Sequence, residues 1–266
     1  MITSYKVAGL TINIDGLDKK THEYWEKFQV PYEIKPVFSI NVLNEDYKRY
    51  KLEFHNIDIG KEQNILIRHG CDILLTDSKW YLNTILPLIS VGNFNVFSNQ
   101  IFYSHAIRYK MVQIHSSVIQ YKDNGILFVG PSGVGKTTQA ELWMQYRDAE
   151  IINGDMAFVQ QKGDNFYVWG TPWHGSSVYC KNTSAMVRAI IVLCQDSQNM
   201  IHLLSGKKKI ESILNNVIYP QWLENGMELC LETLDHLLSA LPVYELSCRP
   251  DEEAVRLTEE AVFGRG

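Results

Sequence analysis

The sequence has no closely spaced pair of cysteines. Its five cysteines are scattered along the chain and form no C-x-x-C pair: Cys71, Cys180, Cys194, Cys230 and Cys248. Disulfide scaffolds, zinc sites and dithiol redox motifs all depend on paired or regularly spaced cysteines. We therefore expect reduced, packed thiols in a protein of the cytoplasm.

Long hydrophobic runs and a basic excess are also missing. No stretch approaches the roughly 18 uncharged apolar residues of a transmembrane helix, and the first residues lack the charged-then-apolar pattern of a signal peptide. Lys and Arg number 25 against 30 Asp and Glu, giving a net charge of −5. This balance argues against a broad nucleic-acid surface. We expect no membrane partner and no nucleic-acid partner.

The length and composition permit one large domain or two smaller ones. The chain has 266 residues, of which 45% are apolar and 21% charged, an ordinary globular balance. Alternating strand-like patterns at 5–15, 37–43, 50–54, 65–69 and 72–76 predict a β-rich N-terminal module over residues 1–95. We expect this module to act as a scaffold or to recognise a partner, and residues 96–266 to form a second, α/β domain.

One short segment carries the strongest signal in the chain. The run Gly130-Pro131-Ser132-Gly133-Val134-Gly135-Lys136-Thr137 is a complete G-x4-G-K-[ST] phosphate-binding pattern, and the apolar strand 126–129 precedes it. In this pattern backbone N–H groups cradle phosphates, the lysine reaches the β- and γ-phosphates, and the hydroxyl ligates Mg²⁺. The alternative is a glycine-rich turn without a ligand. We expect ATP and Mg²⁺ to bind here, with these eight residues and Thr138 contacting the nucleotide.

The elements around this loop are predicted from their periodicity. Residues 112–121 and 125–129 form a predicted hairpin whose turn is Asp123-Asn124-Gly125, and 137–146 is the predicted helix that follows the loop. Further strands are expected at 156–160, 166–169, 186–193 and 243–248. Helices are expected at 208–216, 228–240 and 252–262, the last capped by Asp251.

Asp155 is the first candidate for the chemistry. The run 149–155 predicts a short strand that ends at this carboxylate, 19 positions after Lys136. Phosphoryl transfer needs positioned groups and charge neutralisation. Asp155 is therefore a candidate general base, metal contact, or both, while Lys136 and the metal held by Thr137 would neutralise charge. The alternative is that Asp155 is merely a turn residue after Gly154.

Two further features have both a functional and a structural interpretation. His115 lies on the strand that leads into the hairpin, where a histidine is either an active-site residue or a packed, hydrogen-bonded one. The loop 171–177, Thr-Pro-Trp-His-Gly-Ser-Ser, combines Trp173, His174 and two hydroxyls. It either clamps a nucleotide or an acceptor or is a rigid turn that buries Trp173. No Asn-Lys-x-Asp motif is present, which argues against a GTPase switch protein.

The segment from Ile114 to Lys136 resembles HPr kinase/phosphorylase and its relatives, with ATP-type phosphoenolpyruvate carboxykinases as more distant cousins. In HPr kinases a histidine precedes the phosphate loop by the same distance and the same hairpin follows it. The resemblance covers roughly residues 105–195. It implies an HPr-kinase-like phosphate-loop domain with a mixed β-sheet, and it implies that His115 lies near the transferred phosphate. HPr kinases assemble into hexamers, so a homo-oligomer is a further expectation.

The resemblance has one important departure. HPr kinases carry an Ala-Asp-Asp segment after the helix, and this chain has Asn153-Gly154-Asp155, so Gly154 stands where the first aspartate would be. The Asn-Gly-Asp version is similar to a divergent branch that includes kinases of precursor peptides, such as lasso peptides. We expect an ATP-dependent kinase acting on a hydroxyl, most simply a serine of a peptide or small protein. The alternatives are a kinase of a small polyol or amino acid, and a non-catalytic nucleotide-binding regulatory or peptide-delivery protein.

Overall fold

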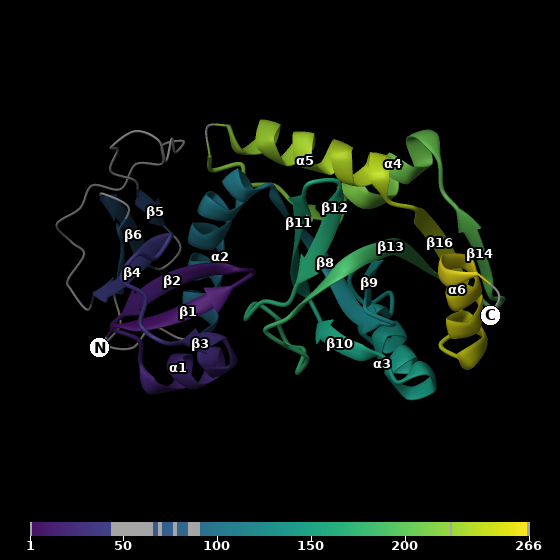
Figure 1. The fold of residues 1–266 in the computed structure, drawn as a ribbon, viewed down its shortest axis with the longest axis horizontal. Helices are drawn as coiled ribbons and strands as arrows, with labels where there is room; N and C mark the ends of the chain where they lie inside the picture. Colours follow the sequence, from purple (N-terminus) through teal and green to yellow (C-terminus); the bar gives the residue numbers. More distant parts are fainter. Residues whose placement is uncertain are drawn as a thin grey trace. The chain divides into compact units, whose positions relative to one another are not determined.

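The computed structural model describes residues 2–43, 66–68, 71–76, 79–84, 91–223 and 225–264. Contacts divide the chain into two compact units (Figure 1). The first comprises residues 1–109 and 219–230, and the second comprises residues 110–218 and 231–266. The domains predicted from the sequence, 1–95 and 96–266, stay a prediction. Residue 95 itself lies inside a helix, Val91–Ala106.

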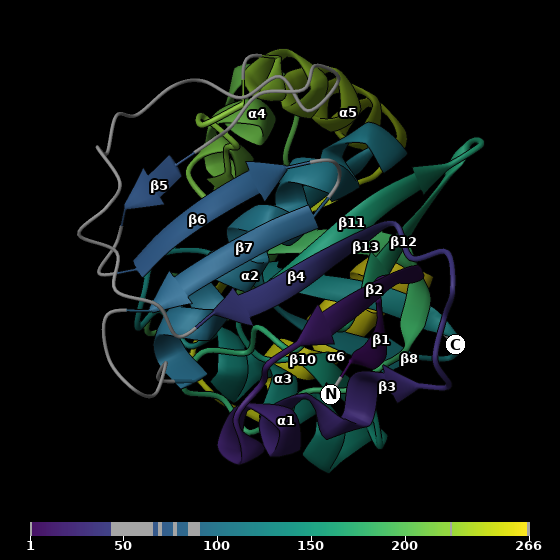
Figure 2. The ribbon, with the colours of Figure 1, turned by 90° about the vertical axis from the view of Figure 1, so that its left-hand side faces the viewer.

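The described residues of the first unit form a mixed seven-stranded sheet, with the α-helices α1 and α2 beside it. The strand order is β3-β1-β2-β4-β7-β6-β5, and Figure 2 shows β2, β4, β7 and β6 side by side with α2 behind them. Phe38 of β4 stacks on His105 of α2 with ring centroids 4.3 Å apart, which fixes the helix against the sheet. The elements are β1 (Thr3–Val7), β2 (Leu10–Asp15), α1 (Lys19–Trp25), β3 (Gln29–Val30), β4 (Phe38–Leu43), β5 (Leu66–Arg68), β6 (Cys71–Thr76), β7 (Lys79–Thr84) and α2 (Val91–Ala106).

The predicted β-rich character of this unit is confirmed, with one correction. The run 5–15 is not one strand, because Ala8 and Gly9 both have positive φ, +46° and +80°, and turn the chain into the antiparallel hairpin β1–β2. Positive φ at both central residues is the geometry of a tight two-residue hairpin. The predicted strand at 37–43 is β4, and the predicted strands at 65–69 and 72–76 correspond to β5 and β6, which pair with each other. The predicted strand 50–54 lies outside the described residues.

The second unit is a mixed nine-stranded sheet with three further helices of its own. The main order is β10-β8-β11-β12-β13-β16-β14, with β15 on β8 and β9 between β8 and β13. The elements are β8 (Met111–Tyr121), β9 (Asn124–Val129), α3 (Lys136–Arg147), β10 (Glu150–Asn153), β11 (Met156–Lys162), β12 (Asn165–Trp169), β13 (Ser184–Gln195), β14 (Met200–Leu203), α4 (Gly206–Leu214), β15 (Val217–Ile218), β16 (Val243–Cys248) and α6 (Glu252–Phe263); α5 (Gly226–Ala240) begins in the first unit. The strands and helices predicted for this region are confirmed, including the cap of α6, where Asp251 accepts from Ala254 N at 3.2 Å.

The hairpin that leads into the loop is confirmed, but its turn lies earlier than predicted. Tyr121 pairs with Asn124, and the two turn residues are Lys122 and Asp123, both with positive φ. Gly125 therefore lies inside β9, where an added Cβ would meet Val168 Cγ1 at 2.8 Å. Close packing, and not the turn, accounts for this glycine. β9 also pairs in parallel with β13, so the loop follows a strand that is hydrogen-bonded on both edges.

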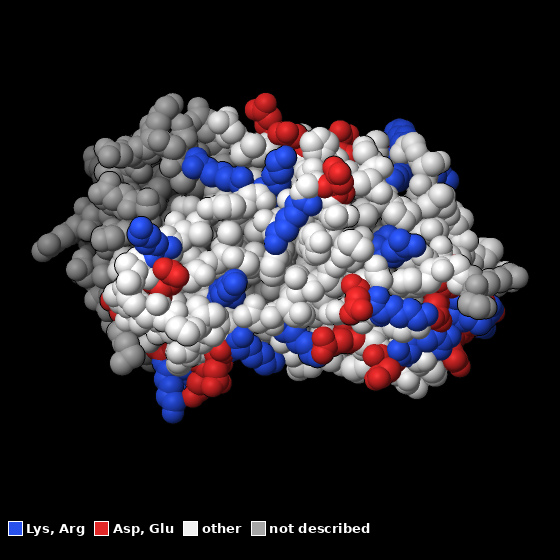
Figure 3. Space-filling model, viewed as in Figure 1, with Lys and Arg blue, Asp and Glu red and all other residues white. Residues whose placement is uncertain are grey.

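Helices α3 and α6 pack over a hydrophobic cluster on the second sheet. Trp143 of α3 is completely buried among Ile119, Phe128 and Val255 in this cluster. Ion pairs between charged side chains also connect the two helices. Figure 3 shows acidic and basic groups intermingled over α3 and α6. Among the described residues, no helix has both the length and the apolar character needed to cross a membrane.

Glu259 of α6 is the centre of the ionic contacts between these helices. It accepts from Arg147 Nε at 2.5 Å and from Tyr121 OH at 2.6 Å, and it pairs with Lys122. Partial burial acts to raise the pKa of Glu259, but the hydrogen bonds from Tyr121, Arg147 and Lys122 outweigh it and lower the pKa below its ordinary value. A carboxylate with a lowered folded-state pKa stabilises the fold above the unfolded-state pKa.

We expect the Glu259→Gln variant to lose about 1 kcal/mol of unfolding free energy at pH 7, the size of one partly exposed charged hydrogen bond. The deficit should shrink as pH falls from about 4.3, the ordinary glutamate pKa, through the lower pKa of the folded protein. Urea unfolding at pH 7 and pH 3 measures both values, with Glu211→Gln, in an exposed pair with Lys207, as control. Equal deficits at the two pH values would contradict the assignment.

Candidate functional site

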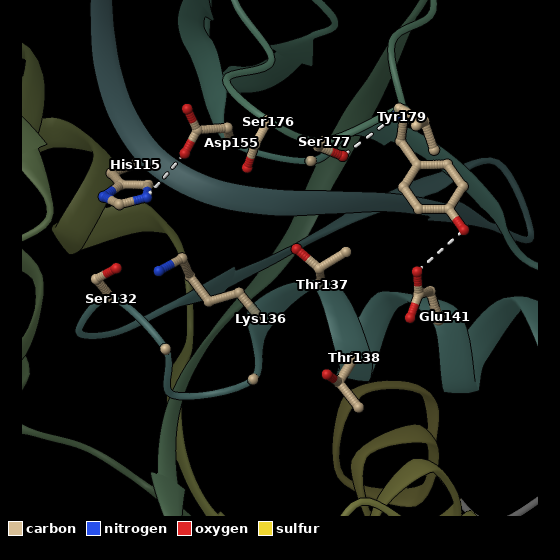
Figure 4. A pocket seen from close by; sticks show the side chains of 14 residues that line it. His115, Ser132, Lys136, Thr137, Thr138, Glu141, Asp155, Ser176, Ser177 and Tyr179 are labelled. Atoms are coloured by element: carbon tan, nitrogen blue, oxygen red, sulfur yellow. Dashed lines mark hydrogen bonds and ion pairs between the residues drawn. The ribbon is translucent and has the colours of Figure 1, made fainter.

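A cavity of about 520 Å³ opens at the N-terminal end of α3 in the second unit. Four parts of the chain form its walls: the glycine-rich loop with the first two turns of α3, strand β8, the segment around residues 154–155 and the segment 176–179 (Figure 4). Its lining residues are His115, Ser132, Gly133, Gly135, Lys136, Thr137, Thr138, Glu141, Gly154, Asp155, Ser176, Ser177, Val178 and Tyr179. Of the predicted site residues, Gly130, Pro131 and Val134 belong to the loop but do not line the cavity.

The loop curls back on itself before α3 begins. Gly133 and Gly135 have φ of +80° and +106°, and Val134 N donates to Pro131 O at 3.3 Å. Gly135 is the N-cap of α3 and offers no capping side chain. The first N–H groups of a helix have no intrahelical partner, so the positive end of the α3 dipole faces the cavity.

Lys136, the first residue of α3, bends back over the loop. Only 8% of the residue is exposed, and its Nζ donates to Gly130 O at 3.0 Å and to Pro131 O at 3.2 Å. Burial lowers the pKa of Lys136, and the negative charge of Asp155 partly opposes this effect. Lys136 and Asp155 line the same cavity.

Thr137 is held by a residue that the sequence analysis missed. Ser117 of β8 is fully buried, and its Oγ lies 3.4 Å from Thr137 Oγ1 and donates to Gly154 O at 3.2 Å. Ser117 thus links the start of α3 to the bend that precedes Asp155. Its position two residues after His115 on the same strand is the signal that could have identified it, because alternate strand residues share a face.

His115 and Asp155 meet directly. His115 Nε2 lies 2.9 Å from Asp155 Oδ1, and about 30% of each side chain is exposed to the cavity. Asp155 does not end a strand as predicted, since β10 stops at Asn153 and the aspartate lies in the bend between β10 and β11. Asn153 sets this bend by accepting from Asp155 N and Met156 N at 2.9 and 3.0 Å. Asp155 is therefore both a turn residue and a cavity residue.

Gly154 is explained by a close approach of the loop 171–179. An added Cβ at Gly154 would lie 1.9 Å from Ser177 Oγ and 2.5 Å from Ser177 Cβ. Gly154 N also donates to Tyr179 O at 3.2 Å, which holds the two segments together. No side chain fits at position 154 while this contact exists. The departure from the Asp-Asp pair thus has a steric cause in this chain.

The loop predicted at 171–177 buries its tryptophan and places two other residues at the cavity, while a role in clamping a nucleotide or an acceptor stays a prediction. Trp173 is 4% exposed and packs edge-on against Phe158, so the tryptophan is part of a rigid buried turn. The hydroxyl groups of Ser176 and Ser177 line the cavity instead, and His174 binds the carbonyl oxygen of Ser177.

Tyr179 and Glu141 bound the cavity at the end away from His115 (Figure 4). Tyr179 OH donates to Glu141 Oε1 at 3.1 Å, joining the loop 176–179 to the second turn of α3. This hydrogen bond, followed by burial, raises the pKa of Tyr179. Neither residue belongs to a motif, and nothing in the sequence pattern identifies them.

We expect Gly154→Ala to lower the unfolding free energy by about 1–3 kcal/mol, the usual cost of overpacking. Adding Ser177→Gly removes the atoms that the new methyl group would meet, so the double variant should recover most of this loss. Thermal unfolding of the two single variants and the double variant measures the coupling. A Gly154→Ala protein as stable as the wild type would show that the two segments are not in close contact.

Comparison with known proteins finds likenesses among solved structures alone. No family model matches the chain, and no curated protein matches it. Among the solved structures, the Hpr(Ser) kinase/phosphatase from Coxiella burnetii is similar with a TM-score of 0.36 and 9% sequence identity, covering 56% of this chain and 95% of that chain.

Proposed function

We propose that this protein binds Mg²⁺·ATP at the loop 130–137 and transfers the γ-phosphoryl group to a hydroxyl, most simply that of a serine in a peptide or small protein. The observation that carries the proposal is the contact between His115 and Asp155, 2.9 Å long, in the same cavity as Lys136 and Thr137. An acid–base pair facing a glycine-rich loop at a helix N-terminus is the arrangement that phosphoryl transfer requires.

The loop side of the cavity suits a polyphosphate. The curled backbone and the N-terminus of α3 supply N–H donors and positive potential, the combination that binds phosphate in many folds. The Lys136 ammonium now donates to two loop carbonyls, and these bonds would be exchanged for phosphate oxygens. Around 500 Å³ also falls within the usual range for a small-molecule site.

Two oxygen donors in the cavity fit a magnesium ion. Thr137 and Asp155 both line it, and hydroxyl and carboxylate oxygens are ligands that Mg²⁺ accepts. The described residues, those of this cavity included, contain no group of three or more His, Cys, Asp or Glu side chains that could hold a metal, so a bound nucleotide would have to complete the site. Mg²⁺ usually takes its remaining ligands from phosphates and water. When bound, it would neutralise charge on the phosphates.

Asp155 is the proposed general base. It would accept the proton of the acceptor hydroxyl as the new oxygen–phosphorus bond forms and the bond to ADP breaks. His115 would orient the carboxylate through its Nε2 contact, and Lys136 would stabilise the negative charge of the phosphates. This division of roles uses one carboxylate, consistent with the glycine at position 154.

The two other functions stay open as alternatives. A small polyol or amino acid would use the same groups, and nothing in the cavity lining favours it over a peptide. Support for a non-catalytic nucleotide-binding protein came from the missing aspartate at position 154. The contact between Gly154 and Ser177 gives that glycine a steric reason, which fits a catalytic and a non-catalytic protein equally.

We expect Asp155→Asn to bind Mg²⁺·ATP with nearly wild-type affinity and to lose transfer by at least about 100-fold, because the amide cannot accept the proton. Lys136→Ala should weaken ATP binding by about tenfold or more, the value of one charged hydrogen-bonding group. Calorimetry measures binding. Release of labelled phosphate from ATP measures hydrolysis by water, and incorporation of the label into a panel of serine peptides, polyols and amino acids measures transfer.

Lys208→Ala, in an exposed stretch of α4, is the control for removing a lysine. Wild-type turnover in Asp155→Asn would remove this residue from the role of base. Tight ATP binding by the wild type without any hydrolysis or transfer would favour the non-catalytic function instead.

A further inference from the structure

Asn216 belongs to none of the sequence motifs. It follows α4 and precedes β15, and only 8% of the residue is exposed. It does not line the cavity. Nevertheless its side chain and its backbone each bind a different part of the site.

The side chain of Asn216 fixes the start of the loop. Its Oδ1 accepts from Gly130 N at 3.0 Å, and Gly130 is the residue directly after β9, where the chain turns with φ of +143°. Its Nδ2 donates to Ser212 O at 2.9 Å in the last turn of α4. The second bond determines the orientation of the amide, because the nitrogen must face Ser212 and the oxygen must then face Gly130.

The backbone of Asn216 fixes the strand that carries His115. Its carbonyl oxygen accepts from His115 N at 2.8 Å, and the adjacent Ser116 N donates to Asp155 O at 2.8 Å. His115 Nε2 in turn holds the Asp155 carboxylate. A continuous series of hydrogen bonds therefore runs from Gly130 through Asn216 and His115 to Asp155.

We infer that Asn216 is a positioning residue for phosphoryl transfer, which sets the distance between the phosphate-holding loop and the His115–Asp155 pair. This inference rests on the proposed function of the site. Asn216 touches no substrate and acts through Gly130 and His115. Transfer is sensitive to such spacing, since a misplacement of about 1 Å can lower a rate by roughly 100-fold.

The test compares Asn216→Leu, which keeps the side-chain size and removes both side-chain hydrogen bonds, with Thr258→Ala. Thr258 is fully buried on α6, binds Ala254 O at 2.8 Å and lies outside the cavity lining, so it matches the loss of a buried polar group in the same unit. We expect Asn216→Leu to lower the turnover of Mg²⁺·ATP hydrolysis by about 100-fold. Its affinity for inorganic tripolyphosphate should change by less than about tenfold. Thr258→Ala should change neither value, even where it lowers the melting temperature equally.

A second readout does not depend on nucleotide. In ¹H–¹⁵N spectra, Asn216→Leu should shift both the Gly130 amide and the His115 ring resonances, and Thr258→Ala should shift neither. Unchanged resonances together with turnover no lower than in Thr258→Ala would overturn the inference. If Asn216→Leu does not fold, Asn216→Ser, which is shorter and polar, takes its place in the same comparison with Thr258→Ala. We expect it to change turnover and the two resonances in the same direction by a smaller amount.

The two proposals fail in different ways. A wild-type protein that neither binds tripolyphosphate nor hydrolyses or transfers from ATP would contradict the proposed function. A wild-type protein that does both, with Asn216→Leu behaving like Thr258→Ala, would contradict only the role of Asn216.

Discussion

The candidate site depends on the register of one strand, β8. This strand pairs with β9, β10, β11 and β15, so four neighbours fix its position. His115, Ser117 and Ile119 alternate on one face, where they reach Asp155, Thr137 and the cluster under α3 respectively. A slip of one residue would turn all three to the other face of the sheet. The same pairings that build the sheet therefore decide which groups meet in the cavity.

The sequence predicted the elements of the second unit well, because strong local signals agree there. The hairpin, the glycine-rich loop and the helix after it carry turn residues, periodicity and a motif at fixed spacing, and β8, β9 and α3 follow them closely. The predictions were wrong where the same residue type can occupy more than one kind of structural position. Gly125 signals a turn in a sequence, but in the structure it makes room for Val168. The 5–15 run hides a turn, because alanine rarely adopts the left-handed conformation that Ala8 has.

The sequence identified the candidate reactive residues of the site, and it did not identify most of the residues that support them. Lys136, Thr137, His115 and Asp155 line one cavity, as the chain order suggested, and their chemical roles stay predictions. Among the residues that hold them in place, only Ser117 had a signal in the sequence, its position two residues after His115 on β8, whereas Asn153 and Asn216 could not be identified. Each acts through a hydrogen bond to backbone or to a hydroxyl in a distant segment, and such bonds leave no periodic pattern in a sequence. Glu141 and Tyr179 escaped for the same reason, since 38 positions separate them along the chain.

The two strands that pair with β9 lie at very different distances from it along the sequence. Its antiparallel partner β8 adjoins it through a two-residue turn, whereas its parallel partner β13 begins about 60 residues later. Short-range pairings form quickly and long-range parallel pairings slowly. Strand β9, which leads into the glycine-rich loop, can thus pair with β8 early in folding. It gains its second row of hydrogen bonds only when β13 pairs with it. Amide protons of β9 should consequently be among the last in this unit to exchange with solvent.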